Sequence, residues 1–228
     1  MKFGIVNGEK VEPYPKAKGV CPHCDSEIIA RCGKVKVWHW AHKRTSHCDH
    51  WWESETEWHR EWKSHFPNEW QEISHVDSET GEKHIADVKN PFGLVIEFQH
   101  SPIKDEERIS REEFYKSMIW VVDGRNHKNN FYIGLDGRPL QKSPLAFQIN
   151  WYGRSRIFHN WGESQVKVFL DLGEDILWRL VKFDVIKKIG VVGFLPKKVF
   201  VDDCLKGINI HVTELKDDSE NEKTHNNS

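Results

Sequence analysis

The chain has 228 residues, of which 38% are hydrophobic and 30% charged, and its formal net charge at pH 7 is −2. This balance excludes a protein that is basic over its whole surface, so any nucleic-acid-binding surface has to be a local patch. No apolar run approaches the roughly 18 residues of a membrane span, and the first residues lack the apolar core of a secretion signal. We therefore expect a soluble, cytoplasmic protein without a membrane partner.

The first 52 residues are predicted to form a small module. In residues 6–11, apolar positions flank a glycine turn, which is typical of a short hairpin. Residues 34–40 alternate between polar and apolar side chains, as a strand does. Four of the five cysteines lie in this region, clustered with histidines. Without a secretion signal, this combination favours metal binding over a disulfide framework.

Residues 53–165 are expected to form the main domain, in which helices and strands follow one another. A helix over residues 53–66 ends at Pro67. Residues 118–122 form a continuous apolar run, which predicts a strand covered on both faces. The other expected elements are strands at residues 69–76, 84–88, 94–100 and 131–135 and a helix at residues 105–117. This order implies a layered α/β fold.

The rest of the chain is divided into two further segments. Residues 166–212 are expected to form a C-terminal α/β extension, with a strand over residues 166–172 and a helix over residues 176–183. Residues 213–228 are polar and contain almost no apolar side chain, which predicts a disordered tail.

Two pairs of metal-ligating residues lie close together in the N-terminal module. Cys21 and Cys24 form a CxxC motif, and His39 and His42 form an HxxH motif after 14 intervening residues. Zinc prefers four tetrahedral ligands of this kind, so we expect a structural zinc ion held by these four residues. The competing ligands are Cys32, His47, Cys48 and His50.

The predicted strands at residues 84–88 and 94–100 carry two acids and an amide. If the strands pair as a hairpin, Asp87 lies opposite or diagonal to Glu97, and Gln99 shares the face of Glu97. Two neighbouring carboxylates raise each other's pKa unless a cation compensates them. Mg²⁺ is the natural counter-ion, because it binds a few carboxylates and keeps open water positions. The alternative is that both acids lie on a solvated face of the sheet.

These acids belong to a pattern that resembles the PD-(D/E)xK nucleases, and the chain more closely resembles the competence protein CoiA-like family. The matching stretches keep their order from residue 21 to residue 123, about half of the chain. They are CPHC (21–24), WHWAH (38–42), ETEWH (55–59) with Lys63, ADV (86–88), IEFQHSPI (96–103), Arg111 with FY (114–115), and IWVVD (119–123).

The resemblance implies a restriction-endonuclease-like core, a mixed central sheet flanked by helices, with the zinc-binding module in front of it. It also implies that Mg²⁺ or Mn²⁺ is held by Asp87, Glu97 and the carbonyl group of the residue after Glu97. Gln99 stands where the wider superfamily has a lysine, and an amide can orient groups but supplies no charge. Lys63 or a second metal ion could provide the missing positive charge.

Further residues are candidates for the same site. Glu55, His59 and Lys63 are spaced by four, so a helix would place them on one face, and we expect them to position water or stabilise charge. The alternative is a hydrated helix face. The candidates for contacts with nucleic acid are Arg111 and Tyr115, which are spaced by four, and Lys43 and Arg44 before the Trp51–Trp52 pair. The alternatives are a salt bridge for Arg111, a core position for Tyr115 and packing for the two tryptophans.

The leading hypothesis is therefore a metal-dependent nuclease, a hydrolase that cleaves DNA phosphodiester bonds, in competence, DNA processing or defence. The rival hypothesis is a DNA-binding or recombination-accessory protein that has kept a nuclease scaffold but does not cleave. Gln99 is the feature that supports the rival. Protein partners in a DNA-processing or defence system would suit the near-neutral charge.

Overall fold

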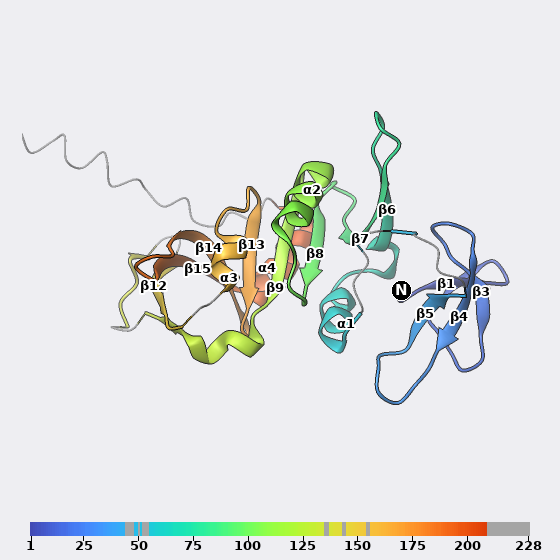
Figure 1. The fold of residues 1–228 in the computed structure, drawn as a ribbon, viewed down its shortest axis with the longest axis horizontal. Helices are drawn as coiled ribbons and strands as arrows, with labels where there is room; N and C mark the ends of the chain where they lie inside the picture. Colours follow the sequence, from blue (N-terminus) through green and yellow to red (C-terminus); the bar gives the residue numbers. More distant parts are fainter. Residues whose placement is uncertain are drawn as a thin grey trace, which may run out of the picture.

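Two β-sheets form the framework of the protein (Figure 1). The computed structural model describes residues 1–43, 48, 49, 51, 55–134, 137–142, 145–153 and 156–208. Within these residues, the smaller sheet has five strands in the order β2-β1-β3-β4-β5. The larger sheet has ten strands, in the order β10-β12-β15-β14-β13-β9-β8-β7-β6, with β11 paired to β12. Arg44, Trp52 and the predicted tail at residues 213–228 lie outside the described residues.

The smaller sheet contains the predicted N-terminal hairpin. Its turn residues Asn7 and Gly8 have positive φ angles of 52° and 83°, as a tight two-residue hairpin turn requires. The strand expected over residues 34–40 begins only at His39, and Val35 is 97% exposed. The five strands, all paired antiparallel, are β1 (Gly4–Val6), β2 (Glu9–Val11), β3 (Lys18–Val20), β4 (Glu27–Arg31) and β5 (His39–His42).

The chain enters the larger sheet through a helix and three antiparallel strands, which are followed by a second helix and a parallel strand. α2 carries the chain across so that β9 lies parallel to β8, while β6, β7 and β8 pair antiparallel. As predicted from its apolar run, β9 is buried along its whole length. These elements are α1 (Glu57–Ser64), the 3₁₀ helix η1 (Asn68–Trp70), β6 (Gln71–Val76), β7 (Lys83–Lys89), β8 (Val95–Gln99), α2 (Asp105–Tyr115) and β9 (Met118–Asp123).

The helix expected over residues 53–66 is shorter than predicted. Thr56 is its N-cap and forms a capping box with His59, so the first helical residue is Glu57. Glu55 therefore precedes the helix, and its predicted place on one helix face with His59 and Lys63 is wrong. The extended backbone of Thr56 ends the helical geometry, and its side chain accepts the otherwise free amide of His59 in the first turn.

The C-terminal part of the chain completes the same sheet. The helix predicted at residues 176–183 is wrong: this segment is strand β14, which pairs with β13 on one side and β15 on the other. Its β-branched and aromatic side chains suit a central strand. β13 lies parallel to β9, so the predicted boundary at residue 165 separates strands that belong to one sheet. The remaining elements are η2 (Arg125–Asn130), β10 (Phe131–Ile133), β11 (Gln141–Lys142), β12 (Leu145–Trp151), α3 (Arg156–Trp161), β13 (Lys167–Asp171), β14 (Ile176–Asp184), β15 (Ile189–Pro196) and α4 (Lys197–Lys206).

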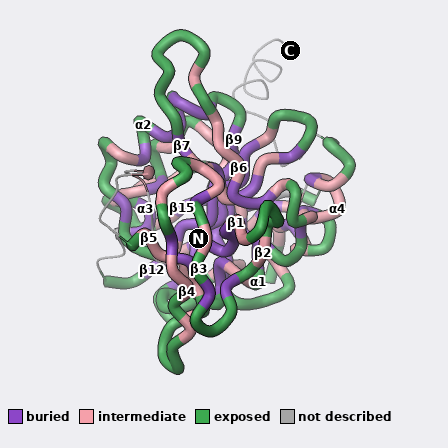
Figure 2. The backbone as a smooth tube through the Cα atoms, turned by 90° about the vertical axis from the view of Figure 1, so that its right-hand side faces the viewer, coloured by how far each residue is buried: buried purple, intermediate pink, exposed green. Residues whose placement is uncertain are grey.

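Helices cover both faces of the larger sheet, and the buried residues gather along its centre (Figure 2). Alternation along β9 sends Trp120 to one face and Val121 to the other. Trp120 packs in a cluster with residues of α2 and α3, whereas Val121 packs with residues of α1 and α4. This packing anchors α1 beside β8, and that position defines the site described below.

Candidate functional site

A small polar cavity lies where α1, β6, β7, β8 and α2 meet the N-terminal residues. Its volume is about 70 Å³, and its lining is unusually rich in charge. The charged side chains in this lining are the acids Asp49, Glu55, Glu72, Asp87 and Glu97 and the cations Lys63 and Arg111. Acidic side chains thus outnumber cationic side chains in this lining.

Asp87 and Glu97 meet across the β7–β8 hairpin. The backbone amide of Asp87 donates a 3.1 Å hydrogen bond to Oε1 of Glu97, and the amide of Phe98 donates a 3.0 Å bond to Oδ2 of Asp87. Glu97 is only 4% exposed. Burial and the neighbouring Asp87 raise the pKa of Glu97 to about 8, although Arg111, 3.1 Å from its Oε2, opposes the shift.

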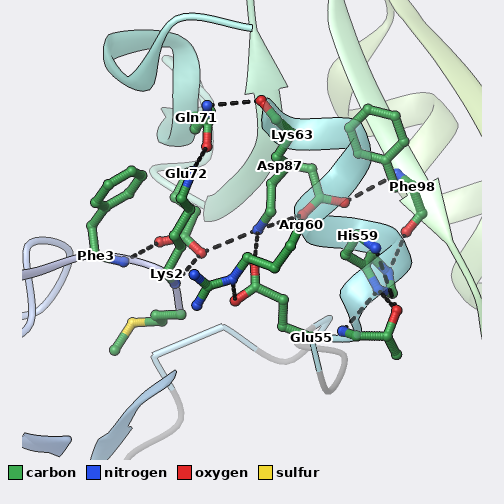
Figure 3. A network of polar contacts seen from close by, with 12 residues as sticks. Lys2, Phe3, Glu55, His59, Arg60, Lys63, Gln71, Glu72, Asp87 and Phe98 are labelled. Atoms are coloured by element: carbon green, nitrogen blue, oxygen red, sulfur yellow. Dashed lines mark hydrogen bonds and ion pairs between the residues drawn. The ribbon is translucent and has the colours of Figure 1, made fainter. Parts of the chain in front are cut away.

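Lys63 lies at the centre of the carboxylates (Figure 3). Its Nζ is 2.6 Å from Glu55, 3.3 Å from Glu72 and 3.7 Å from Oδ1 of Asp87. Burial alone would lower the pKa of this lysine, but these three acids outweigh burial and raise it, so Lys63 stays charged. Lys63 is therefore a buried positive charge shared by three acids of the cavity.

Glu72 is a site residue that sequence reasoning missed. Its carboxylate accepts the backbone amides of Lys2 at 2.6 Å and Phe3 at 3.1 Å, in addition to the contact with Lys63 (Figure 3). Burial opposes its ionisation, but Lys63, the N-terminal ammonium group and the two amides lower the pKa of Glu72 to about 2. The only signal in the sequence is the polar pair Gln71-Glu72 at the start of a predicted strand.

Glu55 reaches the cavity from the extended segment before α1. Its Oε1 contacts Lys63, and its Oε2 lies 2.9 Å from Nε of Arg60. Because both oxygens are held by cations, the pKa of Glu55 falls below its usual value, although burial opposes the shift. The sequence spacing correctly predicted that Glu55 lies near Lys63, but it wrongly placed Glu55 inside the helix.

His59 fixes α1 on the edge of the cavity. The backbone amide of Thr56 donates to Nδ1 of His59 at 3.2 Å, which leaves Nε2 to donate a 2.9 Å bond to the carbonyl oxygen of Phe98. Phe98 is the residue after Glu97, and the carbonyl group of Phe98 was expected to face the metal. The arrangement makes His59 a positioning residue for that carbonyl group.

Gln99 shares a strand face with Glu97 at the end of β8. Its amide donates a 2.9 Å hydrogen bond to the carbonyl oxygen of Ser101. In the part of the chain that the structure describes, Gln99 does not line the cavity. A role next to a bound ion therefore has no support in this geometry.

The residues proposed to contact nucleic acid lie in different surroundings. The Arg111 guanidinium pairs with Glu97 and also donates to the carbonyl oxygen of Trp51, so its donors are engaged at the acidic cavity. Tyr115 is buried among Trp51, His75 and Phe114, and burial raises the pKa of its hydroxyl. Both side chains are internal, so neither presents a surface for a phosphate in this arrangement. Lys43 is exposed and pairs with Glu27 at 2.8 Å.

A second group of polar side chains lies in the N-terminal module. One ligand atom from each of Cys21, Cys24, His42 and Cys48 lies within 4.8 Å of the others. Cys21 and Cys48 Sγ atoms are 3.7 Å apart, close to the roughly 3.8 Å that two 2.3 Å zinc–sulfur bonds at a tetrahedral angle produce. Three thiols and one imidazole fit a structural zinc site, and this cluster could hold such an ion.

Cys48 takes the place predicted for His39. His39 and His42 begin and end strand β5, and residues three apart in a strand lie about 10 Å apart and point to opposite faces. The ring of His39 contacts the carbonyl oxygen of Val37 instead. Burial opposes ionisation of Cys24, but hydrogen bonds with Ser26, His42 and Cys48 lower its pKa to about 6.

The cysteine cluster is joined directly to the acidic cavity. Asp49 follows Cys48 and accepts the backbone amide of Ile85 at 2.7 Å and the ring of His84 at 2.8 Å. Trp51 then stacks on His84. Asp49 and Trp51, which follow Cys48, therefore form one wall of the cavity.

The described residues thus define a mixed α/β protein with a Cys/His cluster suited to zinc and a separate buried acidic cavity. Within that class, residues 10–50 match the family model described as "Competence protein CoiA, N-terminal domain". The match spans the cluster from Cys21 to Cys48 and ends before the residues of the larger sheet. No curated protein and no solved structure matches the chain. Among the helices of the described residues, none is long and apolar enough to cross a membrane.

Proposed function

We propose that the protein is a metal-dependent nuclease that hydrolyses phosphodiester bonds in DNA. The observation that carries the proposal is the convergence of Asp87, Glu97 and Lys63 on one buried cavity. Carboxylates from two adjacent strands with a nearby lysine are the combination needed to hold a divalent cation and stabilise a charged phosphate.

The order of elements supports the same proposal. α1, the antiparallel strands β6–β8, the crossover helix α2 and the parallel strand β9 form a mixed sheet flanked by helices. This is the architecture expected for a restriction-endonuclease-like core. The acids lie at the β7–β8 hairpin, as the PD-(D/E)xK resemblance implies.

The donor chemistry of the cavity fits Mg²⁺ or Mn²⁺. Oxygen ligands would come from Asp87, Glu97 and the carbonyl group of Phe98. Burial and the neighbouring Asp87 both raise the pKa of Glu97, and a bound cation would offset that cost of ionising the acid. When bound, such an ion supplies an acidified water and polarises the phosphate.

The protein's own residues supply orientation and charge. Lys63 lies close enough to Asp87 to stabilise negative charge that develops on the phosphate, and Glu55 holds Lys63 in place. His59 orients the Phe98 carbonyl group, and Arg111 orients the Glu97 carboxylate. Gln99 stays outside this arrangement.

A role in competence follows from the N-terminal match. The family model is described as a competence protein, and a nuclease that processes DNA taken up by the cell would suit that description. A defence system is the other setting in which a protein of this chemistry would act.

The test is a cleavage assay with a metal series. Wild type is incubated with labelled single- and double-stranded DNA and with Mg²⁺, Mn²⁺, Ca²⁺ or chelator, alongside Asp87→Asn and Glu97→Gln. We expect metal-dependent cutting by wild type and at least about a 100-fold loss in both variants. Glu174→Gln, which removes an acid paired with Lys128 on the surface, is the matched control and should cut normally. Equal cutting by all four proteins would reject the site.

The alternative function is DNA binding without cleavage. The observation that favours it is Gln99, which stands where the signature has a lysine. Its amide donates to the carbonyl oxygen of Ser101. Wild type that binds DNA but leaves it intact under every metal condition would support this alternative.

A further inference from the structure

The loop between β4 and β5 has a composition that differs from the rest of the chain. Residues 28–48 contain five cations and not one Asp or Glu, although the whole chain is slightly acidic. The five are Arg31, Lys34, Lys36, Lys43 and Arg44. Lys34 and Lys36 are exposed within residues 32–38, which we call the β4–β5 loop. This loop is a local positive patch of the kind that attracts a phosphate backbone.

The same loop presents an exposed indole ring. Trp38 is 45% exposed, and its Nε1 donates a 3.1 Å hydrogen bond to the carbonyl oxygen of Gly33. This hydrogen bond holds the indole ring against the backbone of the loop. An aromatic ring held at the surface of a loop that carries two lysines is a platform on which an unpaired base can stack.

One arginine connects this loop to the acidic cavity. The Arg60 guanidinium donates a 2.6 Å bond to the carbonyl oxygen of Trp38 and pairs through Nε with Glu55, a residue of the cavity lining. Figure 1 shows the β4–β5 loop projecting from the small sheet on the side of α1, the helix that carries Arg60. A strand bound to the loop therefore lies next to the cavity.

The acidic lining of the cavity gives such a loop a use for a polyanionic substrate. Five acids and two cationic side chains line the cavity, so it repels a phosphate backbone by itself. Cations on the neighbouring loop offset this repulsion and can hold the phosphates on either side of the bond to be cut.

We infer that the β4–β5 loop binds single-stranded DNA, with a base stacked on Trp38 and phosphates on Lys34 and Lys36, and guides the strand to the cavity. The inference names the substrate class of the proposed nuclease and rests on that function for its purpose. It favours a single strand because the bases of a duplex are stacked on one another and offer the ring no free face.

The test measures binding to the full chain carrying Glu97→Gln, so that cleavage does not interfere. A labelled 20-nucleotide single strand and the matching duplex are titrated by fluorescence anisotropy at several salt concentrations. Adding Trp38→Ala should weaken single-strand binding about tenfold, whereas Trp38→Phe, which keeps an aromatic face, should stay close to the parent. Tyr152→Ala removes an aromatic ring that is 65% exposed on the larger sheet and should have no effect.

A charge variant keeps the test independent of the folding of Trp38→Ala. Lys34→Ala/Lys36→Ala should reduce the slope of log affinity against log salt by about 1.4, the value for two phosphate contacts on a single strand. Lys187→Ala/Lys188→Ala, an exposed lysine pair in the turn between β14 and β15, is the matched control and should leave the slope unchanged.

Parent-like binding by Trp38→Ala, or an equal loss on single strand and duplex, would overturn the inference. So would an unchanged salt slope for the lysine variant. Because the readout is binding by a variant that does not cut, a wild type without cleavage activity would reject the nuclease proposal and leave this result standing.

Discussion

The backbone amide of Asp87 and the carboxylate of Glu97 are joined by a 3.1 Å hydrogen bond across the β7–β8 hairpin. The bond brings together two acids ten residues apart in the sequence, and Lys63 approaches the pair from α1. The cavity is therefore built by one local hairpin and one distant helix. The consequences of this arrangement can be tested separately.

The ligands of the cysteine cluster can be distinguished by zinc content. Cys48→Ser and His42→Ala each remove a ligand, so we expect purified protein to retain well under one equivalent of zinc. Cys32→Ser and His39→Ala are the matched controls, because both residues lie outside the cluster, and they should retain about one equivalent. Loss of zinc in His39→Ala with full zinc in Cys48→Ser would restore the original ligand assignment. Elemental analysis of the four variants is the measurement.

Lys63 is expected to be essential for folding. Lys63→Met leaves Glu55, Glu72 and Asp87 without their shared buried cation, and breaking a buried pair of this kind costs about 3–5 kcal/mol. Lys43→Met breaks an exposed pair with Glu27 and should cost less than about 1 kcal/mol. Urea denaturation followed by circular dichroism gives both values, and equal costs would contradict the role assigned to Lys63.

Acid should destabilise the protein partly through Glu72. Its pKa is about 2 in the folded protein and 4.5 as the reference value, so the folded state favours the ionised form. The stabilisation is complete above pH 4.5 and disappears as the pH falls toward 2, and it amounts to about 3 kcal/mol. Glu72→Gln should lower stability at pH 7 and flatten the decline between pH 4.5 and 2. Denaturant melts of both proteins over this range measure the difference, and parallel curves would exclude Glu72.

Gln99 is expected to matter little for cleavage. Its amide contacts Ser101 rather than the acids, so Gln99→Ala should reduce the rate by less than about tenfold, whereas Asp87→Asn should reduce it at least about 100-fold. Rates are compared at saturating metal on the better of the two DNA substrates. A loss in Gln99→Ala as large as that in Asp87→Asn would mean that the amide turns into the cavity when substrate binds.

Local patterns were enough to predict much of the larger sheet. The breaker-rich turn before β8 and the alternation on both sides of it predicted the hairpin that pairs Asp87 with Glu97. The apolar run of β9 predicted its burial on both faces. The segment Ile176–Asp184 was misassigned because its apolar content fits a buried helix as well as a central strand, and pairing with β13 and β15 decides between them.

The sequence by itself determined the CxxC pair and the acid pair, because spacing along a turn or strand controls contacts between near neighbours, and it named Lys63 as a candidate cation without placing it. Only the tertiary structure decided that Cys48 replaces His39, that Glu72 joins the site and that Gln99 leaves it. Those three outcomes depend on the direction in which side chains leave different elements. That direction is set when the sheets and helices pack, since packing fixes the orientation of whole elements rather than of single residues.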